Sequence, residues 1–233
     1  MPTLDVLPAP VLAEYDGIVV VRDDLLQGGT KSRVIDLVLD DDAPEYVYAS
    51  TVYGYAQIAL AVAAKRRGKP ASIFSAKRRD KYIRTRQAEA LGARIVEVPD
   101  GMLSVVTHRA KKYCRETGAQ LVPFGVETPA VFQRLIDIAR ALPVTPTEVW
   151  SVAGSGLLSR ALQAAWPDVP VNAVIVSTSS ASTGRARRFV APETFGVDAK
   201  VKPPFPSCSN YDAKAWRFVK AYAQRGALFW NVA

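Results

Sequence analysis

The sequence predicts an α/β fold in which parallel, twisted sheets are flanked by helices. Short apolar runs alternate with stretches of helical periodicity along the chain, which is the pattern of parallel sheets. Gly68, Gly92 and Gly118 follow the ends of three expected helices, where glycine commonly terminates a helix. Hydrophobic residues form 49% and charged residues 22% of the 233 residues, which excludes a disordered chain or a simple coiled coil. The length fits one large domain or two small intertwined ones.

Each element rests on its own pattern. The run Gly17-Ile-Val-Val-Val21 is typical of a strand, and Thr30 is a suitable cap for a helix that follows it. The expected strands are 17–21, 46–49, 70–74, 95–98, 121–123, 148–152, 171–176 and 227–232. The expected helices are 30–39, 54–67, 80–91, 103–117, 129–142, 157–165 and 213–224. Residues 177–210 are rich in Ser, Thr, Pro and Arg and are expected to form mobile loops.

Several function classes are disfavoured. The longest apolar run, 58–64, is far shorter than the ~20 residues of a membrane span. No basic region followed by an apolar core opens the chain, so we expect no signal peptide and a cytoplasmic protein. Two cysteines and one histidine argue against a disulfide framework, a metal site or Ser-His-Asp chemistry.

Positive charge is concentrated in one stretch. Residues 65–86 contain ten basic residues and one acid, whereas the rest of the chain has 20 basic and 21 acidic residues. Such a segment indicates a polyanionic partner, although a solvated helix face explains the charge alone equally well. The expected nucleic-acid contacts are Lys77, Arg78, Arg79, Lys81, Tyr82, Arg84 and Arg86.

Three short motifs could carry chemistry. In Gly28-Gly-Thr-Lys31-Ser-Arg33, a lysine placed at a helix start would lose its proton readily, as Schiff-base chemistry requires; the alternative is an exposed lysine after a turn. The backbone amides of Gly154-Ser155-Gly156-Leu157-Leu158 could bind phosphate, or simply form a strand-to-helix turn. Asp212 in Tyr211-Asp212-Ala213-Lys214 could face a pyridinium nitrogen or cap a helix.

In this order, the motifs resemble the fold-type II pyridoxal 5′-phosphate (PLP) enzymes, particularly the 1-aminocyclopropane-1-carboxylate deaminase and D-cysteine desulfhydrase branch. The quoted matches span nearly the whole chain: Arg22-Asp-Asp-Leu25, 28–33, Leu91-Gly-Ala93 to Pro99, Val122 to Pro129, 153–156 and 211–214. The resemblance implies the tryptophan-synthase-β-like fold as a single unit, residues 1–233. Its lobes would be a small one at 44–125 and a large one at 1–43 plus 126–233.

The resemblance also implies roles. Lys31 would hold PLP and move protons at the substrate Cα, and the amides of 154–158 would hold the phosphate. Asp212 would keep the pyridine nitrogen protonated, and Tyr211 would stack on or bond near the reacting centre. Tyr55 is expected at the cofactor, because Thr51-Val-Tyr-Gly-Tyr55 replaces the family's Ser-x-Asn segment. A homodimer is the expected assembly.

The departures bear on the substrate. The missing Asn and a shortened stretch between Val176 and Tyr211 put deamination of a small free amino acid in doubt. We expect PLP-dependent decarboxylation or elimination on an amino acid carried by thymine in DNA, as in bacteriophage hypermodification pathways, in the host cytoplasm. The alternatives are a lyase of a free amino acid such as D-cysteine, a non-catalytic nucleic-acid-binding protein, and a phosphate-binding α/β protein unrelated to PLP.

Overall fold

The chain is divided into two compact units. The computed structural model describes residues 7–99, 101–176 and 181–233. Unit 1 comprises Met1–Leu25 and Phe132–Ala233, and unit 2 comprises Leu26–Val131. The sequence predicts the smaller lobe at 44–125. The structure groups residues 26–43 with that lobe, so Lys31 belongs to unit 2.

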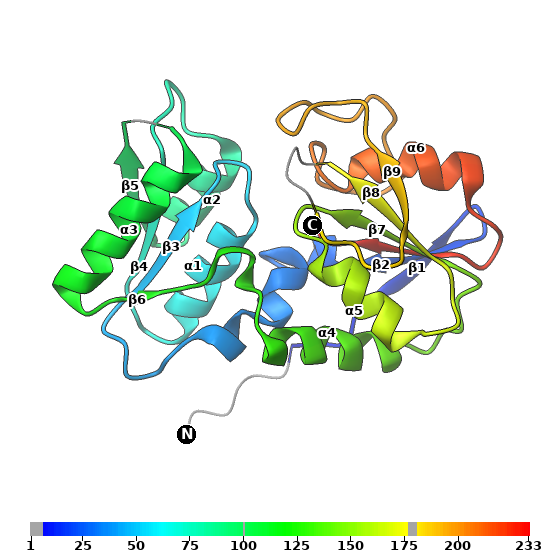
Figure 1. The fold of residues 1–233 in the computed structure, drawn as a ribbon, viewed down its shortest axis with the longest axis horizontal. Helices are drawn as coiled ribbons and strands as arrows, with labels where there is room; N and C mark the ends of the chain where they lie inside the picture. Colours follow the sequence, from blue (N-terminus) through cyan, green and yellow to red (C-terminus); the bar gives the residue numbers. More distant parts are fainter. Residues whose placement is uncertain (1–6, 100, 177–180) are drawn as a thin grey trace. The chain divides into compact units, whose positions relative to one another are not determined.

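Unit 1 is built on a six-stranded sheet (Figure 1). The strand order is β1-β2-β10-β7-β8-β9, and β1–β2 is the antiparallel pair among otherwise parallel neighbours. The strands are β1 (Leu12–Tyr15), β2 (Ile18–Arg22), β7 (Val149–Ala153), β8 (Val171–Ile175), β9 (Arg187–Val190) and β10 (Leu228–Asn231). The short hairpin between β1 and β2 turns at Asp16 and Gly17, which both have positive φ.

Helices cover both faces of this sheet. Trp150 and Val152 of β7 share a core with Trp216 of α6 (Ala213–Tyr222). Successive side chains of a strand point to opposite faces. Ser151 is accordingly on the other face, where it is hydrogen-bonded at 2.8 Å to Ser159 of α5 (Leu157–Ala165). The alternation along β7 therefore places α6 on one face and α5 on the other.

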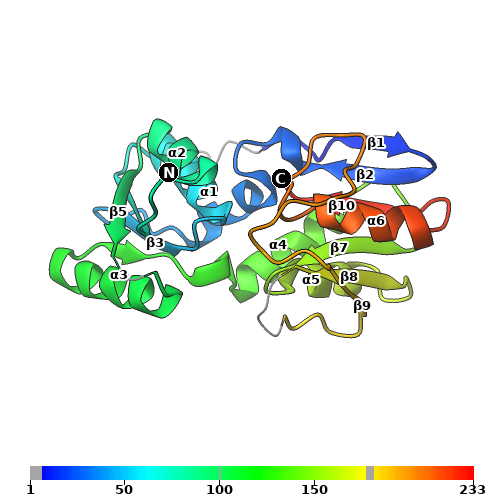
Figure 2. The same ribbon diagram turned by 90° about the horizontal axis from the view of Figure 1, so that it is seen from above.

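Unit 2 has a four-stranded parallel sheet in the order β5-β4-β3-β6. Its strands are β3 (Tyr46–Ser50), β4 (Ala71–Ala76), β5 (Arg94–Val98) and β6 (Gln120–Leu121). Figures 1 and 2 show α3 (Leu103–Thr117) on one face and α1 (Ala56–Arg66) and α2 (Ile83–Ala90) on the other. Because all four strands run the same way, the loops that follow them gather at one carboxyl edge. The last of these loops leads to α4 (Pro129–Arg140).

Most expected elements are confirmed, and α3 and α5 have the expected bounds. The α-helix expected at 30–39 is wrong. Two 3-10 helices, η2 (Gly29–Arg33) and η3 (Ile35–Val38), stand in its place. This segment contains four β-branched residues together with Ser32 and Asp36, which are weaker α-helix formers than alanine or leucine. Ser32 instead donates its hydroxyl to the carbonyl of Gln27 at 2.6 Å.

The segment expected as loops, 177–210, contains strand β9, and residues 177–180 lie outside the described residues. Its remaining described part is largely irregular, as expected. Across the described ranges, no helix combines the length and apolarity that crossing a bilayer would require. Within the same ranges, no cluster of three or more His, Cys, Asp or Glu side chains could hold a metal ion.

Candidate functional site

The glycine loop of unit 1 lies between β7 and α5. Gly156 has a φ of +88°, and a Cβ there would lie 2.7 Å from the carbonyl carbon of Ser182. Only glycine fits this position without moving the backbone. The loop opens the nine-residue helix α5, whose N-terminal amides and dipole attract an anion. The expected strand–loop–helix arrangement is therefore present, and its role in binding phosphate stays a prediction.

Tyr211 closes one side of this loop. Its hydroxyl accepts a hydrogen bond from the Gly154 backbone N–H at 2.9 Å, and a Cβ on Gly154 would lie 3.1 Å from the same oxygen. Burial raises the pKa of Tyr211, so the hydroxyl stays protonated. The amide of Gly154, expected to donate to phosphate, is thus engaged by Tyr211 in this structure. The other expected donors are the amides of Ser155, Gly156, Leu157 and Leu158, and that of Leu157 donates to the Ser155 hydroxyl at 3.4 Å.

Asp212 lies beside Tyr211 and is completely buried. The backbone N–H of Ala233 donates to its Oδ2 at 3.1 Å. Its Oδ1 is buried and has no hydrogen-bond partner among the described residues. Burial, the largest influence, raises the pKa of Asp212 well above 3.8, and the nearby backbone amides oppose this. A cationic N–H donor would satisfy Oδ1 and favour the carboxylate, as the pyridinium nitrogen of PLP would.

Lys31 lies in η2, at the carboxyl edge of the unit 2 sheet. Its ammonium donates to the carbonyl of Gly125, which follows β6, at 3.1 Å. Burial lowers the pKa of Lys31 to about 8, although Glu127 raises it. The sequence pattern points to a helix dipole as the reason for an easily lost proton. The structure corrects this reason, because η2 is a 3-10 helix of five residues and burial is the cause.

The sequence-based prediction assigns no role to the turn that receives Lys31. Gly125 also donates its N–H to the hydroxyl of Tyr48 at 3.3 Å. Gly125 and Val126 both have positive φ, 76° and 61°. A left-handed valine is strained, and such strain concentrates at functional sites. Val126 is fully buried, and a valine in the sequence gives no sign of positive φ.

Tyr55 is the N-cap residue of α1 in unit 2. The guanidinium carbon of Arg84 lies 4.2 Å from the centroid of its ring. Tyr82 packs edge-on against Tyr53, with ring centroids 4.8 Å apart. Arg84 and Tyr82, both expected at nucleic acid, are thus engaged with the loop after β3. The side chains of Tyr82 and Arg84 thus connect the start of α2 to the loop after β3.

The basic stretch 65–86 is divided by strand β4. Before β4, Arg66 and Arg67 form ion pairs with Asp36, which lies outside the stretch. After β4, Lys81 is paired with Glu89 at 2.6 Å. The exposed basic residues beyond β4 are Lys77, Arg78, Arg79 and Arg86. The positive charge available to a partner is therefore smaller than the sequence count and lies largely at the carboxyl edge.

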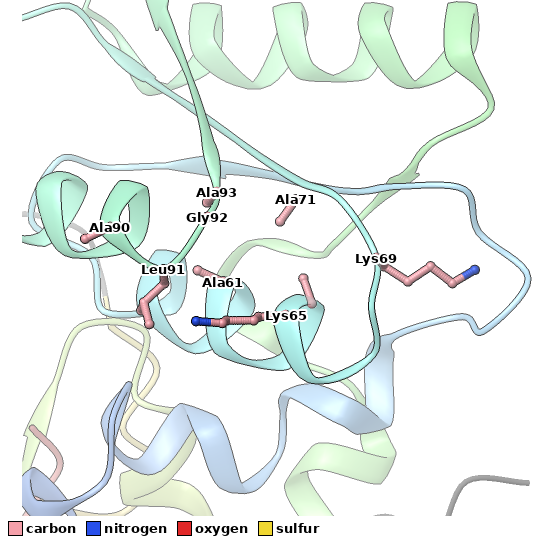
Figure 3. A pocket seen from close by; sticks show the side chains of 9 residues that line it. Ala61, Lys65, Lys69, Ala71, Ala90, Leu91, Gly92 and Ala93 are labelled. Atoms are coloured by element: carbon pink, nitrogen blue, oxygen red, sulfur yellow. The ribbon is translucent and has the colours of Figure 1, made fainter.

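A pocket of about 300 Å³ lies away from that edge (Figure 3). It is lined mainly by alanines, with Lys65 and Lys69 at its sides. Lys69 donates to the carbonyls of Asp41 and Ala43 at 2.7 and 2.9 Å. Because Ala71 opens strand β4, this pocket belongs to the amino edge, remote from Lys31 within the unit. It contains none of the expected site residues.

The structure thus brings Gly154, Tyr211 and Asp212 together in unit 1. It places Lys31, Tyr55 and the basic residues 77–86 in unit 2. Oδ1 of Asp212 as an acceptor and the amides of the glycine loop as donors suit a phosphorylated pyridine. A lysine with a lowered pKa is suited to bind an aldehyde.

No protein-family model and no curated protein sequence matches the chain. Solved structures, in contrast, match the chain. A structure described as an ACC deaminase homologue has a TM-score of 0.82 at 12% identity, covering 98% of this chain and 90% of its own. Diaminopropionate ammonia lyase of Escherichia coli has 0.68 at 16%, covering 99% and 84%. Threonine deaminase isoform 2 of Solanum lycopersicum has 0.71 at 15%, covering 100% and 81%. These similarities establish the fold.

Proposed function

We propose, from the fold-type II PLP architecture that this chain has, that it is a PLP-dependent enzyme acting at the Cα of an amino-acid substrate. The observation that carries the proposal is Oδ1 of Asp212, which is buried without a hydrogen-bond partner among the described residues and follows Tyr211, the residue that contacts Gly154. The similar solved structures are described as a deaminase homologue, an ammonia lyase, a deaminase and a synthase. These descriptions support chemistry on an amino acid.

In this proposal each residue has one task. The amides of 155–158 bind the phosphate, Asp212 accepts the pyridine N–H, and Lys31 holds the cofactor through its amine. When bound, PLP supplies an electron sink for a bond broken at Cα. With a pKa of about 8, Lys31 can both give and take a proton near neutral pH. Decarboxylation breaks the Cα–carboxylate bond, releases CO2 and needs one proton at Cα. Elimination removes a proton from Cα and expels a β-substituent.

Absorbance spectroscopy with added PLP tests the proposal. The wild type should develop a visible band that borohydride reduction abolishes, leaving the cofactor on the peptide that contains Lys31. Lys31→Ala should give no such band. Lys65→Ala, which removes an exposed lysine from the same unit, is the matched control and should behave as wild type. Absence of the band from the wild type would refute the proposal.

More specifically, we propose that the substrate amino acid is carried on a modified thymine in DNA. The exposed Lys77, Arg78 and Arg79 support this, because they follow β4 at the carboxyl edge where Lys31 bonds to Gly125. Lysine and arginine contacts to phosphates bind DNA in a salt-dependent manner. The competing proposal is a lyase of a free small amino acid, which the described neighbours favour.

DNA-binding titrations at several salt concentrations separate the two. Replacing Lys77, Arg78 and Arg79 by Gln should lower the slope of log affinity against log salt by about 0.9 for each phosphate that the variant no longer neutralises. A triple variant of the exposed Arg109, Lys111 and Arg115 on α3 is matched in charge and should change the slope less. Turnover of free amino acids that is independent of DNA, with none on amino-acid-modified DNA, would establish the competing proposal.

A further inference from the structure

Lys214 in α6 is buried, although it carries an ammonium group. Only 1% of its surface is exposed. Its Nζ donates to three consecutive backbone carbonyls, those of Glu193, Thr194 and Phe195, at 3.4, 2.8 and 3.3 Å. An ammonium has three donors, so this arrangement uses all of them. Burying an ammonium costs free energy, which its hydrogen bonds only offset. An apolar residue would fill the same space without that cost.

The segment that Lys214 holds lies outside the regular elements of unit 1. Residues 191–212, between β9 and α6, form neither helix nor strand. The backbone ladder of a sheet or helix therefore does not fix residues 193–195. Individual hydrogen bonds do so instead. The Val197 N–H donates to the carbonyl of Thr194 at 2.9 Å, and the Lys200 N–H donates to the carboxylate of Glu193 at 3.3 Å. Asn210 donates to the carbonyl of Phe195 at 3.3 Å, and Arg217 lies 3.5 Å from the carboxylate of Glu193. Lys214 supplies the three bonds at the centre of this set.

Phe195 connects this segment to the glycine loop. Its ring packs edge-on against the ring of Tyr211, with centroids 6.4 Å apart and an angle of 83° between planes. The hydroxyl of Tyr211 in turn accepts the N–H of Gly154. A continuous series of contacts therefore runs within unit 1 from the Lys214 ammonium through Phe195 and Tyr211 to Gly154.

We infer that Lys214 is a positioning residue for the phosphate-binding loop. Its ammonium fixes residues 193–195, the Phe195 ring fixes Tyr211, and Tyr211 fixes Gly154 at the start of the loop. The inference rests on the proposed function, because it takes this loop as the site of the PLP phosphate. A loop held in advance binds an anion better than one that must be ordered on binding.

The test compares two ligands that differ only in the phosphate. Dissociation constants of PLP and of pyridoxal are measured for the wild type and for Lys214→Met, which keeps the chain length without the charge. PLP affinity should fall on the order of ten-fold, as for other residues that orient a binding group. Pyridoxal affinity should change by less than about two-fold, since pyridoxal has no phosphate for the loop to bind. Lys220→Met, at an exposed position of the same helix, is the control and should alter neither.

A second variant guards against misfolding. Phe195→Leu keeps Lys214 and its carbonyl partners but removes the ring contact, and it should weaken PLP selectively too. Equal weakening of both ligands would assign Lys214 a general structural role and overturn the inference, as would wild-type PLP affinity in both variants. If the wild type binds neither ligand, the proposed function itself fails, and the inference falls with it.

Discussion

Gly28 is a position where a single added methyl group should disturb the Lys31 segment. Gly28 has a φ of +91°, and a Cβ there would lie 2.7 Å from the Cα and 2.9 Å from the N of Ala59, in the backbone of α1. Contacts this short require the backbone of η2 or α1 to move. Lys31 follows three residues later, so we expect the same shift to displace its amine from Gly125.

The cost can be divided with a matched control. Gly68 has a φ of +63°, but a Cβ there would meet no atom within 4 Å. Gly68→Ala should therefore cost only the left-handed conformation, about 1–2 kcal/mol. Gly28→Ala adds the clash, about 1–3 kcal/mol more, for a total of about 2–5 kcal/mol. With a urea m-value of about 2–3 kcal/mol/M, the midpoint should fall by about 0.5 M for Gly68→Ala and about 1–2 M for Gly28→Ala.

Urea unfolding followed by circular dichroism measures both variants, and amine labelling follows Lys31. Gly28→Ala should also move the labelling midpoint of Lys31 away from about pH 8 and towards that of an exposed lysine, because displacement would reduce its burial. Gly68→Ala should leave that midpoint unchanged. Equal destabilisation by the two substitutions would refute the reasoning, because the close approach to Ala59 would then carry no energy.

Three other predictions follow from the titrating groups and their partners. In the wild type, acylation of Lys31, read by mass spectrometry of its peptide, should have a midpoint near pH 8; a midpoint near 10.5 would contradict the burial of its amine. Tyr211→Phe removes the acceptor of the Gly154 N–H and should cost about 1 kcal/mol in urea unfolding, and unchanged stability would show that this bond contributes nothing. Because burial raises the pKa of Asp212, this carboxyl retains a proton in the folded chain that it loses in the unfolded chain as pH rises above 3.8, so the contribution of Asp212 to stability falls over that range. Asp212→Asn should reduce this fall in thermal unfolding series from pH 4 to 8, and identical series would contradict the assigned shift.

Local sequence determined most of the elements. The helices 103–117 and 157–165 are predicted with the bounds that the structure has, because their periodicity and flanking glycines are local signals. The glycine loop after β7 is predicted for the same reason. The Tyr211–Asp212 pair is predicted by resemblance, and the structure shows the contact of Tyr211 with Gly154.

Only the tertiary structure decided the electrostatics. Counting residues makes 65–86 one basic segment, but Asp36 neutralises part of it from outside the stretch, and β4 separates its two ends. The lowered pKa of Lys31 and the orphaned oxygen of Asp212 come from burial, which depends on atoms distant in sequence. Local propensity and glycine punctuation are readable from the sequence because they act within a few residues. Desolvation and ion pairing are not, because they arise only once the chain has brought remote groups together.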